Sequence, residues 1–176
     1  MAGHSHWAGI KHKKEAEDKK RGQVFSKILS AITAAAKSEP NPEFNPKLRS
    51  LIEKARDLKV PQENIERAIK RSKESGNSTE ELILEAYGPS GAAILIEAIT
   101  DNKNRTVAEI KNILNETGAK WADPGSVLWA FLETPNGWEP KFKNDINETD
   151  KRLLEKIITE LENHSDVQKV YTNINL

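Results

Sequence analysis

Residues 82–100 read LILEAYGPSGAAILIEAIT, two short β-rich runs on either side of Gly88-Pro89-Ser90-Gly91. Glycine, proline and serine favour a tight turn, whereas the isoleucine-rich flanks favour extended strands. The stretch therefore predicts a β-hairpin, and the rest of the chain can be placed around it.

Two helices and two further strands are expected after the hairpin. Apolar residues at helical spacing predict helices over residues 104–118 and 147–166. The runs GSVLWAFLE (125–133) and VQKVYTNINL (167–176) predict the third and fourth strands. Strands interleaved with two helices predict the α+β class, with both helices on one face of a mainly antiparallel four-stranded sheet.

A bundle of three helices is expected before the hairpin. Residues 1–12 show no clean periodicity and are interpreted as an irregular arm. Helical spacing of apolar residues runs from about residue 13 to residue 37, and Gly22 leaves open whether this is one helix or two. Residues 48–58 and 60–73 predict two more amphipathic helices, which completes a small bundle.

The polar stretch ESGNSTEE predicts a domain boundary at about residue 77. It separates a basic helical domain with an N-terminal arm (1–77) from an acidic α+β domain (78–176).

The formal charge of zero hides an asymmetry between the two halves of the chain. Residues 1–75 carry 17 lysines and arginines against 10 acidic residues, and residues 76–176 carry 10 against 17. A net charge of +7 followed by one of −7 indicates a half that meets a polyanion and a half that is solvated or meets a partner. The alternative is a chance distribution of charge.

Composition excludes several classes of protein. The 176 residues include no cysteine, so disulfides and thiolate metal sites are excluded. No apolar stretch approaches the roughly 20 residues that span a bilayer. Acidic residues at Glu15, Glu17 and Asp18 argue against a mitochondrial presequence. A cytoplasmic protein that does not bind membranes is therefore expected.

The sequence predicts neither an enzyme nor a cofactor, metal or small-molecule substrate. It contains no glycine-rich phosphate loop, GxSxG elbow or HExxH motif, although acids from distant positions can still converge. His4 and His6 would face the same way on an extended arm, and Ala2-Gly3-His4 resembles a copper or nickel chelate. Both arrangements lack a third strong side-chain ligand.

The strongest candidates for binding are basic residues near the N-terminus. Closely spaced cations suit the neutralisation of nucleic-acid phosphates, because each contact releases counterions and the effects add up. A solvated helix face is the alternative. The adjacent Trp7 could stack on a base or pack against the bundle. The basic cluster consists of Lys11, His12, Lys13, Lys14, Lys19, Lys20 and Arg21.

Two further groups are candidates. Lys70 and Arg71 extend the basic surface, or stabilise the C-terminal end of their own helix. Asn104 and Arg105 lie at a strand-to-helix junction, where free N–H groups and a guanidinium can hold a phosphate. The alternative there is helix capping by Asp101 or Asn104.

Three other tryptophans, Trp121, Trp129 and Trp138, are expected to pack within the protein.

Long motifs resemble the YebC/PmpR family. Members open with MAGHSxWxxIKHxKxxxDxKRGxxF, and this chain opens with MAGHSHWAGIKHKKEAEDKKRGQVF. The similarity continues through NPKLRSLIEKA, VPQENIERAIKR and GSVLWAF to DVQKVYTNI. The family pattern YGPxGxAxxxExxTDNxNRT is present as YGPSGAAILIEAITDNKNRT.

The resemblance implies a helical domain followed by α+β domains. Some members are described as transcriptional regulators that bind DNA, and others resemble ribosome-associated translation factors. Typical members carry a third, ferredoxin-like domain after the GSVxxxF strand, and this chain passes almost directly to the family's closing helix.

We therefore expect a nucleic-acid-binding regulator of gene expression that binds DNA. The alternative is a ribosome-associated translation factor that binds ribosomal RNA and relieves stalling at proline-rich stretches. The sequence shows no helix rich in base-reading side chains, which leaves room for recognition of structured RNA.

Overall fold

The computed structural model describes the backbone of residues 3–74, 76, 79–135 and 137–176, and side chains from Glu17 onward within these ranges. The chain divides into an N-terminal unit, Met1–Ser75, and a C-terminal unit, Gly76–Leu176. Within the described part, no helix combines the length and hydropathy that crossing a membrane requires.

The N-terminal unit consists of α1 (Gly3–Ala36), α2 (Pro46–Asp57) and α3 (Gln62–Arg71). Helix α1 continues without a break through Gly22, so the open choice is resolved in favour of one helix. The expected irregular arm is wrong over residues 3–12, which are helical. This segment contains no proline, so nothing in its backbone stops the helix of the following residues from continuing toward the N-terminus, although it has no apolar stripe.

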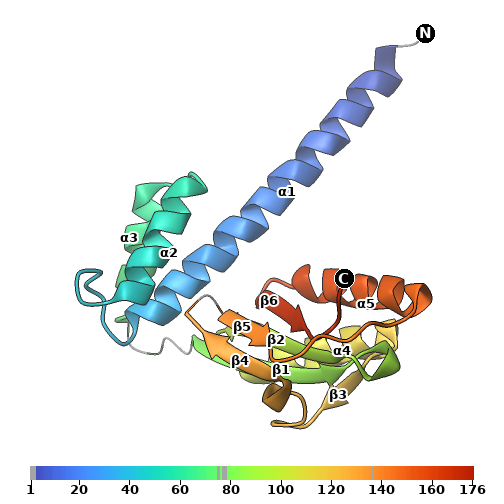
Figure 1. The fold of residues 1–176 in the computed structure, drawn as a ribbon. Helices are drawn as coiled ribbons and strands as arrows, with labels where there is room; N and C mark the ends of the chain where they lie inside the picture. The colour runs from blue at the N-terminus through green and yellow to red at the C-terminus, as the bar shows by residue number, and fades with distance from the viewer. Residues whose placement is uncertain (1–2, 75, 77–78, 136) are drawn as a thin grey trace. The chain divides into compact units, whose positions relative to one another are not determined.

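The core of the N-terminal unit lies at the C-terminal end of α1, where α2 and α3 pack against it (Figure 1). Ile32, Leu48 and Ile65 bring one fully buried side chain from each helix. Asn45 joins the first two helices, because its Oδ1 accepts from the Leu48 N–H and its Nδ2 donates to the Ala35 carbonyl. This amide satisfies groups that both helix ends would otherwise leave unpaired.

The C-terminal unit is an antiparallel sheet with strand order β3-β1-β2-β6. The expected hairpin is formed by β1 (Glu80–Tyr87) and β2 (Ala93–Thr100), joined through a short 3-10 turn, η1 (Pro89–Gly91). Strand β6 (Val167–Thr172) pairs with β2, as the α+β class requires. The other edge strand, β3 (Lys120–Ala122), pairs with β1.

The predicted third strand at residues 125–133 is wrong. Its central part forms a 3-10 turn, η2 (Leu128–Ala130), and only β4 (Phe131–Thr134) is extended. Strand β4 pairs with β5 (Gly137–Pro140) in a separate two-stranded sheet. The apolar residues of this run are buried by packing over the main sheet, so they are shielded from water although the run is not one of its strands.

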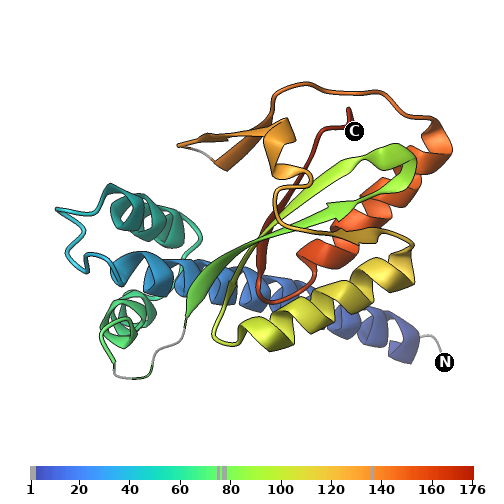
Figure 2. The same ribbon diagram turned by 90° about the horizontal axis from the view of Figure 1, so that it is seen from below.

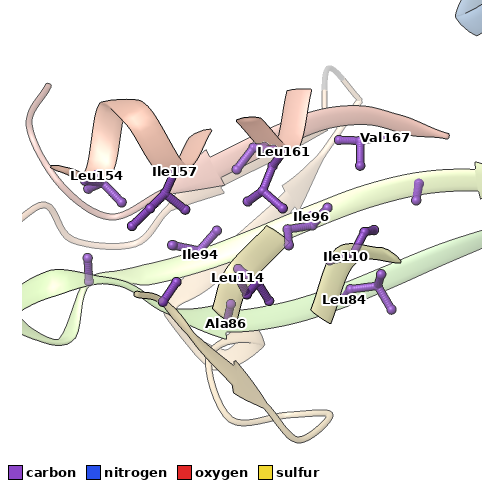
Figure 3. Packing of buried hydrophobic residues seen from close by; sticks show 14 of the residues in the cluster. Leu84, Ala86, Ile94, Ile96, Ile110, Leu114, Leu154, Ile157, Leu161 and Val167 are labelled. Atoms are coloured by element: carbon purple, nitrogen blue, oxygen red, sulfur yellow. The ribbon is translucent and has the colours of Figure 1, made fainter. Parts of the chain in front are cut away.

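Two helices cover one face of the main sheet, α4 (Lys103–Thr117) and α5 (Glu148–Glu162), which lie side by side in Figure 2. Figure 3 shows Leu154, Ile157 and Leu161 of α5 directed at the isoleucines of β2. This is the one-sided helical layer that the sequence predicted.

The opposite face of the sheet is also covered. Ala93 and Leu95 of β2 pack there against Val127, Ala130 and Phe131. Strand β2 is therefore buried on both faces, which explains why its sequence is a nearly continuous apolar run and shows no alternation.

Gly137 supports this second layer. It has a φ of 112°, and an added Cβ would clash with the hydroxyl group of Tyr171. That hydroxyl donates to Glu97 Oε2 at 2.9 Å. Burial, reinforced by the neighbouring Glu97 carboxylate, raises the pKa of Tyr171, so the phenol stays protonated as a donor.

We expect Gly137→Ala to lower the free energy of unfolding more than Gly91→Ala does. Gly91 also has a positive φ, but an added Cβ there meets nothing within 4 Å. The control should therefore lose only the conformational term of about 1–2 kcal/mol, and the clash should add about 1 kcal/mol or more. Urea unfolding of both variants measures the difference in unfolding free energy. Equal losses of unfolding free energy in the two variants would contradict the predicted clash with Tyr171.

Candidate nucleic-acid interface

The described part of the predicted basic cluster lies on α1. Lys19, Lys20 and Arg21 are all exposed to solvent. The Arg21 side chain is 70% exposed, and its guanidinium lies 3.6 Å from Asp18 Oδ1, one turn earlier. Such an exposed pair contributes little to stability, so it leaves the guanidinium available for a phosphate.

The side chains of the remaining members of the cluster lie outside the described residues. Their backbone is helical and continues the same helix toward its N-terminus. These members are Trp7, Lys11, His12, Lys13 and Lys14.

Lys70 and Arg71 are exposed in the last turn of α3. This position suits stabilisation of the helix C-terminus, where the backbone carbonyls carry partial negative charge. Nucleic-acid binding by this pair stays a prediction.

Asn104 and Arg105 occupy the first turn of α4, as the sequence implied, but the helix is capped by neither of the expected residues. Asn102 is the cap, and its side chain accepts from the Arg105 N–H at 3.1 Å. Asn104 is exposed. A phosphate at this helix end would therefore have to compete with an internal cap.

The Arg105 guanidinium is engaged within the C-terminal unit. One nitrogen lies 2.9 Å from Asp166 Oδ2 and 3.0 Å from Asp101 Oδ1. Asp166 follows α5 and is far away in sequence, so the pair joins the start of α4 to the loop before β6. The hydrogen bond to Asp166 raises the pKa of Arg105, which keeps the cation permanently charged. Phosphate binding by Arg105 stays a prediction, and it would require displacing these carboxylates.

Asp166 is the centre of this ionic cluster. Burial alone would raise the pKa of the carboxyl, but hydrogen bonds from Thr106 and Arg105 outweigh burial and lower it. The Thr106 hydroxyl donates at 2.6 Å. A carboxylate with these two donors is held in its charged form.

His164 and Glu109 lie beside Asp166, and the ligand atoms of the three residues lie within 4.8 Å of one another. His164 Nδ1 accepts from the Asp166 N–H at 3.1 Å, so the ring proton lies on Nε2, which is 2.9 Å from Glu109. Both ring nitrogens are therefore used internally, and the imidazole has no free lone pair for a metal. The hydrogen bonds and ion pairs of this cluster connect α4 to the loop after α5. Sequence reasoning missed it because its members come from distant segments.

We expect Asp166→Asn to lower the free energy of unfolding at pH 7 by about 1–2 kcal/mol, because a charge-assisted hydrogen bond becomes a neutral one. The folded-state pKa is below the ordinary 3.8, so this stabilisation is present above about pH 4 and is lost as the pH falls through the lowered value. Urea titrations between pH 7 and pH 3 should therefore show the variant and the wild type converging.

Asp123→Asn is the matched control, because it removes the charge of an exposed aspartate in the same unit. A constant difference between Asp166→Asn and the wild type over this pH range would contradict the assignment.

A buried carboxylate fixes the loop that follows β3. Glu85 is 3% exposed and accepts from the N–H groups of Gly125 at 2.6 Å, Val127 at 2.6 Å and Leu128 at 2.9 Å. Three donors from one loop replace the water that the carboxylate loses on burial. The loop leads directly into η2, so Glu85 sets the position of Trp129.

We expect Glu85→Gln to lower the free energy of unfolding by about 2 kcal/mol or more, because the amide NH₂ would face a backbone donor. Glu80→Gln, an exposed position on the same strand, is the control and should change stability little. Thermal unfolding at neutral pH compares the two. A loss no larger than that of the control would show that the loop does not depend on the carboxylate.

The expected packing of the tryptophans is wrong for Trp129. Trp121 and Trp138 are half-buried and pack against the two cores of the C-terminal unit. Trp129, by contrast, is 61% exposed. Its neighbours Val127, Ala130 and Phe131 fill the space over the sheet, and the indole is left outside. The sequence does not indicate which of these four residues stays exposed, because all four are hydrophobic.

Comparisons with known proteins agree with the two-unit fold. A model described as the TACO1/YebC protein N-terminal domain matches residues 5–75, and one described as the TACO1/YebC second and third domain matches residues 79–136. A crystal structure of a conserved hypothetical protein, Aq1575 from Aquifex aeolicus, has a TM-score of 0.84 and 28% identity, over 90% of this chain and 91% of that one.

Several curated relatives carry the name probable transcriptional regulatory protein. The relative from Halothermothrix orenii is 43% identical over all of this chain and 68% of its own length. The one from Persephonella marina is 47% identical over 90% of this chain and 63% of its own. The one from Caldanaerobacter subterraneus is 51% identical over 74% of this chain and 55% of its own length.

The chain belongs to the TACO1/YebC family, which confirms the resemblance seen in the motifs. The relatives' names are those of regulatory proteins and not of enzymes. The chain spans 55 to 68% of the length of the three relatives named.

Proposed function

We propose that the protein is a nucleic-acid-binding regulator of gene expression whose N-terminal unit contacts the phosphate backbone. The observation that carries the proposal is the exposed basic segment of α1, which includes Lys19, Lys20 and Arg21. An extended helix with several cations can follow a line of phosphates, and each neutralised phosphate adds affinity by releasing counterions.

The geometry of α1 supports this role. Positions 21, 28 and 35 are spaced seven residues apart, so they lie close to one face of a continuous helix. Ile28 and Ala35 are buried in the bundle, whereas Arg21 on the same face is exposed. The face that packs at Ile28 and Ala35 is therefore open to solvent at Arg21, where a cation replaces an apolar residue.

The division of charge supports the same unit as the binding surface. The N-terminal unit has a net charge of +7 and the C-terminal unit one of −7. A polyanion is attracted to the first and repelled by the second, which would orient the protein as it approaches. The expected cytoplasmic location follows from this function and stays a prediction.

The names of the relatives favour DNA as the target, and we propose DNA binding on that ground. The second candidate is ribosomal RNA, in the setting of a ribosome-associated translation factor. The exposed residues of α1 that the structure describes are mainly lysine, arginine and acids, which suit binding to the phosphate backbone better than base reading. Backbone and shape recognition are typical of structured RNA, so this candidate is kept.

We expect the variant Lys19→Glu, Lys20→Glu, Arg21→Glu to bind a DNA duplex at low salt at least about tenfold more weakly than wild type. The slope of log affinity against log salt should also fall, by about 0.9 for each phosphate that the variant no longer neutralises. Fluorescence anisotropy with a labelled duplex, repeated with a structured RNA hairpin, measures both quantities.

The control is Lys103→Glu, Lys120→Glu, Lys156→Glu, which makes the same change of charge at exposed positions of the C-terminal unit. If both variants weaken binding equally, only net charge matters and the assignment to α1 is wrong. Crosslinking in growing cells, followed by sequencing of the recovered nucleic acid, decides between the targets. Recovery of mainly ribosomal RNA would replace DNA by the second candidate.

A further inference from the structure

An aromatic surface lies on the C-terminal unit, away from the basic helix in sequence. Trp129 is 61% exposed and Phe142 is 40% exposed. Their ring centroids are 5.7 Å apart, with the planes inclined by 33°. Two large aromatic rings that touch each other at the surface are uncommon unless they meet a partner, because each exposes apolar area to water.

A hydrogen bond from its ring nitrogen holds the indole of Trp129 in position. Its Nε1 donates to the Ser126 carbonyl at 2.8 Å, and the Tyr87 hydroxyl donates to the same oxygen at 3.0 Å. Ser126 belongs to the loop that the buried Glu85 carboxylate fixes. The polar edge of the ring is thus satisfied internally, so the exposed face of the indole offers stacking and not hydrogen bonding.

Two lysines are the sequence neighbours of the second aromatic residue. Lys141 and Lys143 lie on either side of Phe142, both are exposed, and neither forms an ion pair with another described side chain. The Lys141 N–H donates to the Ala130 carbonyl at 2.9 Å, which fixes this segment beside Trp129.

Acidic residues occur at the margins of this basic segment. Glu139 precedes it, and Asp145, which follows it, accepts from the Asn175 side chain. Between these two residues the sequence PKFKN carries only positive charge, within a unit whose net charge is −7. The surface therefore differs in charge from the unit around it.

We propose that Trp129 and Phe142 form a stacking platform for unpaired nucleotide bases, with Lys141 and Lys143 neutralising the adjacent phosphates. An exposed aromatic face next to lysines is the combination with which proteins bind single-stranded nucleic acid. The proposal rests on the proposed function and extends it, because it assigns a second binding surface of different chemistry to the acidic unit. Phe142 and both lysines lie beyond residue 136, where the match to the family model ends.

A protein partner is the competing occupant. An apolar protein surface would use the whole exposed area, including Leu132, which is 57% exposed. Bases need the rings and the cations but gain little from an isolated leucine. The local positive charge favours the nucleic acid, and Leu132 provides the variant that separates the two.

The test compares wild type, Trp129→Ala, Trp129→Phe and Leu132→Ala in the full chain. The probes are a labelled 12-nucleotide single-stranded RNA of mixed sequence and the duplex that it forms with its complement. Trp129→Ala should weaken binding of the single strand roughly five- to a hundredfold and leave duplex affinity nearly unchanged. Trp129→Phe should retain most of the affinity, and Leu132→Ala should bind like wild type.

Tryptophan fluorescence gives a second readout. Stacked bases should quench the emission of wild type more than that of Trp129→Phe. In addition, Lys141→Glu, Lys143→Glu should weaken binding of the single strand and reduce its salt dependence. Because all four positions are exposed, the variants should keep the wild-type melting temperature, and a scan of each checks this.

Unchanged single-strand affinity in Trp129→Ala would overturn the platform, and equal losses in Trp129→Ala and Leu132→Ala would assign the surface to a protein partner. Neither result touches the proposed function, which depends on duplex binding by α1. If wild type binds neither of these probes and also fails to bind the DNA duplex, the proposed function itself fails.

Discussion

Burial of β2 on both of its faces is the constraint that organises the C-terminal unit. Ile94 and Ile96 pack under the two helices, whereas Leu95 requires a second cover on the opposite face. Residues 127–131 and Trp138 supply most of it, and Glu85 makes this possible by accepting hydrogen bonds from three N–H groups of a loop that has no strand partner. Without that carboxylate, the loop would bring unpaired backbone donors into an apolar layer. One buried charge therefore permits a three-layered unit and sets the position of the exposed tryptophan.

The motif DNKNRT shows how a sequence that suits a ligand can instead serve the fold. Arg105 lies at the start of a helix, as an anion site would require, yet its guanidinium is paired with Asp101 and Asp166. The cap is Asn102, and Asp166 is further held by Thr106. These interactions tie the start of α4 to the loop before β6, so the motif has a structural role whether or not a phosphate also binds.

The two proposed modes of binding nucleic acid differ in their physics. Cations along α1 would act through the phosphate charge, which is independent of sequence and weakens with salt. The rings of Trp129 and Phe142 would act through stacking, which requires bases that are not paired. A protein with both modes can distinguish a duplex from a region where strands are open. Such regions occur in transcribed DNA and in structured RNA, so the same chemistry is compatible with either target.

The sequence by itself determined the helices, apart from residues 3–12 of α1, together with the hairpin and the α+β class, because periodicity and turn residues act over a few neighbouring positions. It also located the basic segment of α1, since charge is read directly from composition. Only the tertiary structure decided that Lys120–Ala122 is the third strand, which is too short to leave a pattern. It alone placed Trp129 outside and Arg105 against Asp166. Those outcomes depend on which distant residues share limited space and charge, and no local pattern carries that information.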